Sequence, residues 1–499
     1  METDITITIR RSRIDIYPYT LGTSPTLEKR LQCYDYNKKE ITMEVYLYNY
    51  KDRCLSVPKG FSISEVVRCL ETDSIYTSKT IDKSDLIDRS RTVDIKMRPG
   101  VAARDEHQIS SITFLLDKND PQKFLNIDTG YGKTFCTIKA ISLIGKASMI
   151  VMGKSSLMQQ WKKVIKEYTF CSDDEICLIQ GRDSVKKALR PENLNKYKFY
   201  ICATQTLAIM AEENELDNFV RTCGIGIKAI DEAHELMKAN FYIDLRCNVE
   251  YNYYLTATPE RSDTSEHILY NRITKTIPRY GSYTTELKKY IHVKNVLINT
   301  QPAPFHKRIC RTKQGFSSII YENFIFKNDN KKTFLFLICM YIISKLINHD
   351  KEAKILILFS TKDHINQIAA LIKKNLGITC GIFTSDLNDD LKKAQLNKNV
   401  ILSTLKSSGA GMDIQGLRAV VNFIPFKSPV LLHQLMGRLR YMEGKALFYF
   451  NVVDEGFDDI VRQNFARQIF FKKKSKDISN LELDMNTLLN EYINKKRVA

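Results

Sequence analysis

The chain has 499 residues, of which 43% are hydrophobic and 26% charged, so we expect two or three folded domains rather than a disordered polymer. No apolar run has the length of a membrane span, and residues 1–4 lack the basic start of a signal peptide, so we expect a cytoplasmic protein without a membrane partner. The formal net charge of +18 favours a polyanionic partner such as nucleic acid, because each Lys or Arg placed on a phosphate releases counterions.

Residues 1–98 are predicted to form a small accessory domain that is rich in strands. Apolar and polar residues alternate over 5–10 and partly over 13–17, which is typical of half-buried strands. Pro99 and Gly100 predict a turn at the end of this segment. The segment contains no nucleotide-binding motif.

Residues 99–290 and 346–470 show short apolar runs separated by helical stretches, the pattern of parallel sheets covered on both faces. In the first segment, strands are expected at 124–127, 148–152, 199–202, 227–230 and 253–255. In the second, they are expected at 355–359, 400–402, 419–421 and 446–448. The chain is thus predicted to be an α/β protein with two tandem lobes. Residues 291–345 are interpreted as a connector with a helix over 334–347, and residues 471–499 as a basic tail ending in a helix over 480–495.

A glycine-rich turn follows the first strand and leads into a helix, which is the context that a phosphate loop requires. Its residues are Asp128, Thr129, Gly130, Tyr131, Gly132, Lys133 and Thr134. The glycines let backbone N–H groups approach the phosphates of ATP at the helix N-terminus. Lys133 is expected to reach the β- and γ-phosphates, and Thr134 to bind Mg²⁺. Ile127 replaces the first glycine of the usual motif, so an ordinary turn before a helix stays the alternative.

An acidic motif, Asp231-Glu232-Ala233-His234, follows the strand at 227–230. Ligands bind at this carboxyl edge of parallel sheets. Asp231 is a candidate Mg²⁺ ligand, and Glu232 could orient and deprotonate the attacking water. His234 could report the nucleotide state to other parts of the chain. Taken alone, the motif could also be the solvated start of a helix.

The run from Leu255 to Arg261 follows the next strand and contains the hydroxyl residues Thr256 and Thr258. These side chains could link the acidic motif to the other lobe through hydrogen bonds. The alternative is a plain turn that ends at Pro259.

In this order, the motifs resemble those of superfamily 2 helicases of the DEAH/DExH type. The resemblance continues through the family's fourth motif at 355–361, its fifth at 403–404 and 409–413, and its sixth at 434–438. It implies two RecA-like lobes that close on ATP, with parallel sheets, and it implies ATP and Mg²⁺ as cofactors.

The same resemblance assigns roles in the second lobe. Arg438 would contact the γ-phosphate as an arginine finger, with Gln434 beside it. Gly411 and Asp413 would contribute to nucleotide binding. Tyr441 stands where the family has a second arginine, so either Arg440, one place earlier, reaches the nucleotide or that finger is missing.

Further assignments come from position relative to these motifs. Arg104 and Gln108 lie before the phosphate loop, where relatives often use Gln to read adenine; an exposed polar helix start is the alternative. Residues 151–161, with Lys154 and Gln160, resemble the motif that touches the nucleic-acid backbone, although Trp161 is most simply a core residue.

Thr204 and Thr404 are similarly placed to hold phosphates of the strand. The predicted function is therefore an ATP-dependent helicase or translocase. The resemblance implies 3′-to-5′ movement, and we prefer DNA as the substrate over RNA.

The layout is similar to helicases of large cytoplasmic DNA viruses, including the poxvirus transcript-release helicase. This similarity implies transcription, replication or repair in the host cytoplasm or virion, with the transcription or replication machinery as a partner. Two alternatives stay open: a nucleoprotein remodeller or transcript-release factor that does not unwind, and a nucleic-acid-binding scaffold with an impaired ATP site. A restriction-type motor subunit would need a nuclease constellation that the sequence does not display.

Overall fold

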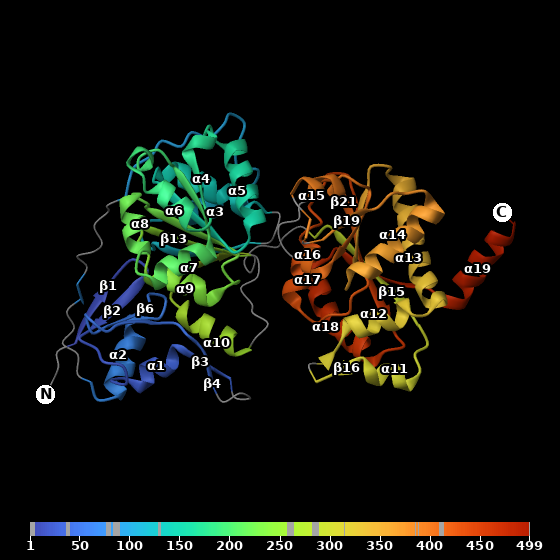
Figure 1. The fold of residues 1–499 in the computed structure, drawn as a ribbon, viewed down its shortest axis with the longest axis horizontal. Helices are drawn as coiled ribbons and strands as arrows, with labels where there is room; N and C mark the ends of the chain where they lie inside the picture. Colours follow the sequence, from blue (N-terminus) through green and yellow to red (C-terminus); the bar gives the residue numbers. More distant parts are fainter. Residues whose placement is uncertain are drawn as a thin grey trace. The chain divides into compact units, whose positions relative to one another are not determined.

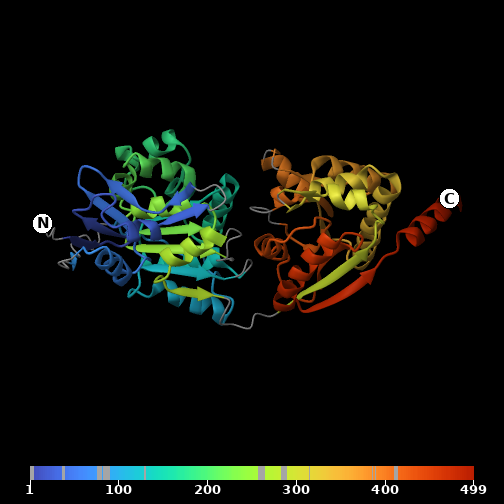
Figure 2. The ribbon, with the colours of Figure 1, turned by 90° about the horizontal axis from the view of Figure 1, so that it is seen from below.

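The computed structural model describes residues 5–35, 40–75, 81–82, 90–127, 131–256, 264–281, 289–313, 315–384, 386–387, 389–408 and 414–498. The chain divides into two compact units, Met1–Glu286 and Leu287–Ala499, which we describe separately. Figures 1 and 2 show that each unit is built around a sheet with helices packed against it.

A seven-stranded parallel sheet forms the centre of the first unit, in the order β10-β11-β9-β12-β13-β8-β14. Its strands are β8 (Gln122–Asn126), β9 (Ser148–Met152), β10 (Ile176–Ile179), β11 (Phe199–Ala203), β12 (Ile227–Asp231), β13 (Tyr251–Thr256) and β14 (Arg279–Gly281). Every residue of β8, β9, β11 and β13 is buried, because helices cover both faces. The five expected strands are confirmed, and the structure adds β10 and β14 at the two edges.

The helices of this unit connect successive strands. They are α3 (Glu106–Leu116), α4 (Lys133–Ile144), α5 (Ser155–Tyr168), α6 (Arg182–Ala188), α7 (Thr204–Glu212), α8 (Leu216–Thr222), α9 (Met237–Leu245) and α10 (Thr264–Ile273). The helix α4 begins at Lys133, as the phosphate-loop motif predicts.

The strand-rich N-terminal region forms a second sheet in this unit, in the order β5-β6-β2-β1-β7. The elements of this region are β1 (Thr6–Ile9), β2 (Arg13–Tyr17), α1 (Pro25–Arg30), β3 (Gln32–Asp35), β4 (Glu40–Glu44), β5 (Leu47–Asn49), β6 (Cys54–Pro58), α2 (Ile63–Thr72) and β7 (Ile81–Asp82). The strands β3 and β4 pair with each other in a separate sheet. The pairs β1–β2, β2–β6 and β5–β6 are antiparallel, whereas β1–β7 is parallel.

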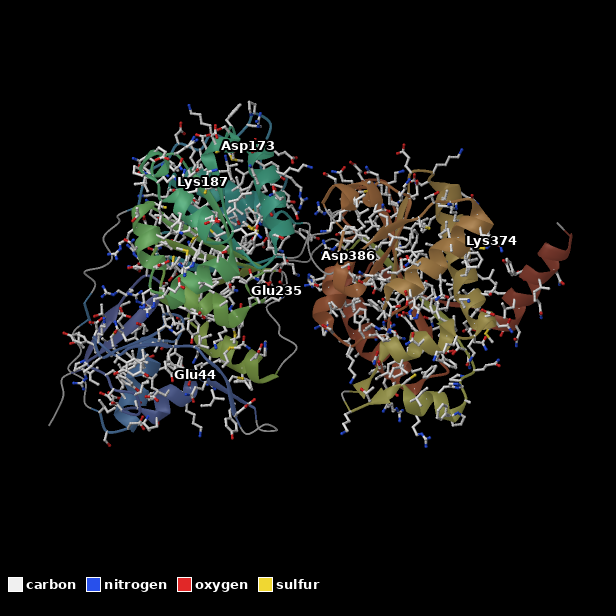
Figure 3. All side chains as sticks on the ribbon, in the orientation of Figure 1. Glu44, Asp173, Lys187, Glu235, Lys374 and Asp386 are labelled. Carbon is white, nitrogen blue, oxygen red and sulfur yellow. The ribbon has the colours of Figure 1, made fainter. Side chains whose placement is uncertain are left out.

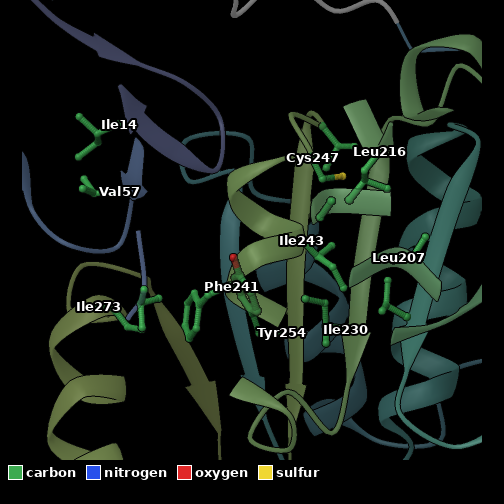
Figure 4. Close-up of a cluster of buried hydrophobic side chains, with 14 of the residues drawn as sticks. Ile14, Val57, Leu207, Leu216, Ile230, Phe241, Ile243, Cys247, Tyr254 and Ile273 are labelled. Carbon is green, nitrogen blue, oxygen red and sulfur yellow. The ribbon is translucent and has the colours of Figure 1, made fainter. Parts of the chain in front are cut away.

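The N-terminal region and the first lobe share one apolar core. Figure 4 shows Ile14 and Val57 of the N-terminal strands together with Phe241 and Tyr254 of the lobe, and all four belong to the same buried cluster. Ser12 also donates a hydrogen bond to the carbonyl oxygen of Asp244 at 2.7 Å. Residues 90–98, predicted to close the accessory domain, already pair with the lobe through the bridges Thr92–Lys146 and Met97–Thr169.

A second seven-stranded parallel sheet forms the centre of the other unit, in the order β19-β20-β18-β21-β22-β15-β23. Its strands are β15 (Ile291–Ile298), β18 (Lys354–Phe359), β19 (Gly381–Phe383), β20 (Val400–Thr404), β21 (Leu417–Asn422), β22 (Leu447–Asp454) and β23 (Asp477–Glu482). The remaining elements are α11 (Pro304–Ile309), β16 (Arg311–Thr312), β17 (Gly315–Phe316), α12 (Ser318–Phe326), α13 (Asp329–His349), α14 (Lys362–Leu376), α15 (Asp389–Leu396), α16 (Leu405–Ser408), α17 (Pro429–Met436), α18 (Asp458–Lys474) and α19 (Met485–Val498). The predicted α/β class with two tandem RecA-like lobes is thus confirmed.

The interpretation of residues 291–345 as a connector needs correction. The strand β15 lies inside the second sheet, where it pairs with β22 and β23. Figure 2 shows β15 and β23 side by side at one edge of the sheet. Lys294 and Asn295 interrupt the apolar run of β15, so the sequence pattern did not indicate a strand at this position. The predicted basic tail likewise contributes β23 before its helix begins at Met485.

The helix α13 is the one helix among the described residues whose length and apolar composition would suit a membrane span, contrary to our expectation from the sequence. Its apolar residues pack into the core of the second unit, in the same buried cluster as Val296 and Ile357. Eight residues of the helix are buried: Phe334, Leu335, Phe336, Leu337, Ile338, Cys339, Ile342 and Ile343. The packing is that of a core helix.

Candidate nucleotide and nucleic-acid site

The start of α4 has the geometry of a phosphate loop. Gly132 caps the helix with φ +90°, and a Cβ atom at this position would lie 2.4 Å from Nε2 of Gln108. The left-handed backbone conformation therefore favours glycine, and any side chain here would have to displace the amide of Gln108. Lys133 donates a hydrogen bond from Nζ to the carbonyl oxygen of Ile127 at 2.8 Å, and Thr134 follows it on the first turn. Three predicted site residues of the loop, Asp128, Thr129 and Gly130, lie outside the described residues.

Gln108 connects α3 to this loop. Its side chain is buried, accepts a hydrogen bond from the backbone N–H of Arg104 at 2.9 Å, and donates one to the carbonyl oxygen of Tyr131 at 3.1 Å. The guanidinium carbon of Arg104 lies 5.9 Å from the centroid of the Tyr131 ring. The structure therefore brings the buried Gln108 and the exposed Arg104 to the loop.

Two aromatic residues that we had not singled out also lie at this loop. The ring of His107 is 5.9 Å from that of Tyr131 and 5.7 Å from that of Tyr280, measured between centroids. Tyr280 comes from β14, far away in the sequence, so no local pattern indicated its presence here.

Asp231 lies at the end of β12, where its carboxylate is held by two donors. The indole Nε1–H of Trp161 donates to Oδ2 at 2.8 Å, and the backbone N–H of Glu232 donates to Oδ1 at 3.0 Å. The pKa of Asp231 is raised to about 6, first by burial and then by the charge of Glu232, against the lowering effects of the Trp161 hydrogen bond and the charge of Lys133. The helix α4, which begins at Lys133 after β8, and the acidic motif at the end of β12 thus both lie at the carboxyl edge of the same parallel sheet.

The acidic motif is also attached to the end of β13. The ring nitrogen Nδ1 of His234 lies 2.8 Å from Oγ1 of Thr256 and 3.4 Å from Oε2 of Glu232. Glu232 has φ +49°, a left-handed conformation that is rare outside glycine and concentrates at functional sites. The structure thus joins His234, Thr256 and Glu232, whereas Thr258 lies outside the described residues.

The first-lobe candidates for backbone binding differ in accessibility. Lys154 forms an ion pair with Glu235, which is labelled in Figure 3, at 3.4 Å. Gln160 is partly exposed on α5, whereas Thr204 is only 2% exposed. The neighbouring Gln205 is exposed and donates to the carbonyl oxygen of Gly153 at 3.2 Å, so it joins the turns after β9 and β11.

The described second-lobe candidates lie at the end of β20, on α17 and directly after α17. Thr404 is partly exposed and its hydroxyl bonds to Oγ of Ser407 at 2.9 Å. Gln434 and Arg438 are partly buried, whereas Arg440 and Tyr441 are exposed. The ring of Tyr441 lies 5.6 Å from that of Tyr290. Gly411 and Asp413 lie outside the described residues.

The described residues contain two all-parallel sheets, a glycine-capped helix that begins at a lysine, and an Asp-Glu pair at a sheet's carboxyl edge, the features that the resemblance to helicases predicts. Comparisons with known proteins agree. Residues 101–261 match the family model of the type III restriction enzyme, res subunit, and residues 332–441 match that of the helicase conserved C-terminal domain. The chain therefore contains both helicase-family domains.

The relatives are viral. The chain is 20% identical over 367 residues to transcript termination protein A18 of Yaba-like disease virus, covering 68% of this chain and 70% of that protein. It is 21% identical over 406 residues to transcript termination protein OPG145 of Monkeypox virus, covering 77% and 75%. A solved structure of a variant of S. cerevisiae Dbp5 bound to RNA and ADP BeF3 has the same fold, with a TM-score of 0.51 at 14% identity over 80% of this chain and 98% of that one.

Proposed function

We propose that the chain is an ATP-driven motor on nucleic acid that acts in viral transcription. The observation that carries this proposal is the position of the phosphate-loop helix after β8 and of Asp231 and Glu232 after β12, at the carboxyl edge of one parallel sheet. The poxviral transcript termination proteins support the transcriptional role. The net charge of +18 supports a polyanionic partner.

Each first-lobe residue has a proposed task in hydrolysis. Lys133 and the N–H groups at the start of α4 bind the β- and γ-phosphates of ATP. The hydroxyl of Thr134 and the carboxylate of Asp231 are hard oxygen donors that fit Mg²⁺, which when bound would neutralise charge on the phosphate oxygens. Glu232 is partly exposed, so it can orient a water molecule and accept its proton.

The remaining assignments follow from the helicase resemblance. We assign Gln434 and Arg438 to the γ-phosphate, and Arg440, Gly411 and Asp413 to other parts of the nucleotide. Sequence-independent backbone binding by Lys154, Gln160 and Thr404 would give 3′-to-5′ translocation, with DNA as the preferred polymer. The hydroxyl of Thr204, predicted to join them, is too deeply buried to reach a phosphate. A viral transcription factor of this kind would work in the host cytoplasm or the virion.

The test is ATP hydrolysis by the full chain without polymer and with single-stranded DNA, duplex DNA or RNA. We expect at least one polymer to stimulate hydrolysis, and Lys133→Ala to abolish both basal and stimulated turnover because it removes the cation on the phosphates. Lys139→Ala, on the same helix but away from its N-terminus, is the matched control and should retain activity.

If no polymer stimulates the wild-type chain, the motor proposal is wrong. Stimulation by RNA alone would overturn the preference for DNA. The names of the poxviral relatives favour a second candidate, release of a transcript without strand separation. Tailed duplexes distinguish the two, because a helicase displaces the shorter strand and the position of the tail gives the polarity.

The contact between His234 and Thr256 predicts a coupling defect. Replacing His234 with Ala should lower polymer-stimulated hydrolysis roughly tenfold, the rate equivalent of one hydrogen bond, and basal hydrolysis by less. His234→Asn, whose amide can occupy the place of Nδ1, should recover most of the loss. Equal losses of basal and stimulated turnover in His234→Ala would contradict a coupling role.

A further inference from the structure

The segment from Ala303 to Lys327 contains α11, the β16–β17 hairpin and α12 and lies between β15 and α13. We call it the α11–α12 segment. It falls outside both family-model matches, which cover 101–261 and 332–441. Figure 1 shows α11 and β16 together at one end of the second unit, below α12.

Topology places the α11–α12 segment at the edge of the sheet that carries the second-lobe motifs. It follows the carboxyl end of β15, and all strands of this sheet are parallel, so the carboxyl ends of β18 and β20 lie at the same edge. Glu322 of α12 holds the segment at this edge through hydrogen bonds. Its buried carboxylate accepts hydrogen bonds from Oγ of Ser360 at 2.7 Å and from the backbone N–H of Ser360 at 2.8 Å. The segment is therefore anchored to the turn after β18, at the edge that also holds Thr404.

The exposed side chains of this segment include several cations and an aromatic ring. Phe305 has an exposed fraction of 57%, and the guanidinium carbon of Arg308 lies 5.8 Å from the centroid of its ring. Five cationic residues occur between 303 and 328, against one carboxylate, and that carboxylate is the buried Glu322. These cations are Lys307, Arg308, Arg311, Lys313 and Lys327. Asp459 of α18 forms an ion pair with Arg311, so the other four dominate the local charge.

This combination fits a single nucleic-acid strand. Exposed cations bind backbone phosphates, and an exposed aromatic ring stacks on an unpaired base of any sequence. A duplex would not offer that base face, because its bases are stacked on each other. We infer that Phe305, with Lys307 and Arg308 beside it, forms a stacking platform for single-stranded nucleic acid at the carboxyl edge of the second-lobe sheet. The inference deepens the proposed function and rests on its nucleic-acid partner.

The aromatic part is tested by fluorescence anisotropy of labelled oligothymidylate DNA and oligouridylate RNA with the full chain. Phe305→Ala should raise the Kd roughly 5- to 100-fold, the effect of losing one stacked base, and Phe305→Tyr should restore binding. Phe465→Ala is the matched control, since Phe465 is also highly exposed on the second unit but lies on α18. A change confined to DNA or to RNA identifies the polymer that uses the platform.

The electrostatic part is tested by salt dependence. The double variant Lys307→Glu/Arg308→Glu should make the slope of log Kd against log salt shallower by about 1.4, corresponding to two lost phosphate contacts on a single strand. The matched charge reversal, Lys373→Glu/Lys374→Glu on α14, should leave the slope unchanged; Lys374 is labelled in Figure 3.

The outcomes separate this inference from the proposed function. If Phe305→Ala binds both oligonucleotides as tightly as Phe465→Ala, the platform is wrong, even where polymers still stimulate ATP hydrolysis. If binding depends on Phe305 but no polymer stimulates hydrolysis, the platform stands and the motor proposal fails. Because Phe305, Lys307 and Arg308 are at least partly exposed, their substitution should leave the melting temperature close to that of the wild type.

Discussion

Replacement of Glu232 by Gln should lower the turnover of ATP hydrolysis roughly 10²- to 10⁴-fold while leaving ATP binding nearly unchanged. Gln has the shape of Glu but cannot accept a proton from the attacking water. The phosphates would still meet Lys133 and the start of α4, so the loss should appear in the chemical step. Single-turnover hydrolysis measures that step, and equilibrium binding of a fluorescent ATP analogue measures affinity.

The control for this variant is Glu213→Gln, which makes the same chemical change at a residue paired with Arg182 on the surface. It should hydrolyse ATP at the wild-type rate. A Glu232→Gln protein that keeps more than a tenth of the wild-type turnover would remove Glu232 from the role of general base. Loss of ATP binding together with turnover would instead indicate damage to the loop after β12.

The central strands could be predicted because burial on both faces demands continuous apolar runs. All residues of β9 and β13 are buried, and their positions were evident from the sequence. The strand β15 was missed because polar residues interrupt it. In the structure these residues pair with the distant β23: Nζ of Lys294 donates to Ser479 at 2.7 Å, and Nδ2 of Asn295 donates to Asn480 at 3.0 Å. Such a polar ladder at the sheet edge has no signal in either segment alone.

In the candidate site, too, some features could be predicted from the sequence and others could not. The order of glycines, Lys133 and Asp231 along the chain was sufficient to place the phosphate loop and the acidic motif on one sheet edge, because both follow parallel strands. The contacts that orient these residues were not predictable. Gln108 reaches the loop because α3 packs against α4, and the spacing of residues in the sequence does not reveal that packing.

Trp161 illustrates this limit most clearly, and it gives the second large expected effect. We interpreted it as a core residue, and it is indeed buried, but its indole N–H also donates to Asp231 across 70 positions of sequence. Trp161→Phe keeps an aromatic ring in the core and removes that donor. A hydrogen bond to a charged group contributes about 1.5–3 kcal/mol, and loss of an outer partner of a metal ligand typically costs 10- to 100-fold in affinity.

We therefore expect the Mg²⁺ concentration that gives half-maximal ATP hydrolysis to rise roughly 10- to 100-fold in Trp161→Phe, with a smaller fall in turnover at saturating Mg²⁺. Met158→Ala is the control, because Met158 is buried one turn earlier on α5 and its thioether has no N–H or O–H group to donate to Asp231. If Met158→Ala shifts the Mg²⁺ requirement equally, disturbed packing of α5 is responsible and the hydrogen bond is not.

A second readout needs no substitution, because Trp161 is the only tryptophan of the chain. Intrinsic tryptophan fluorescence therefore reports on one indole, which is in direct contact with the proposed Mg²⁺ ligand. Addition of Mg²⁺ with ATP should change its emission, and the change should titrate with the same Mg²⁺ dependence as hydrolysis. If hydrolysis depends on Mg²⁺ but the tryptophan emission does not change when Mg²⁺ and ATP are added, Trp161 does not position Asp231. Since α5 also carries the backbone-binding candidate Gln160, a further change on adding a polymer would make this helix the physical link between strand binding and the metal site.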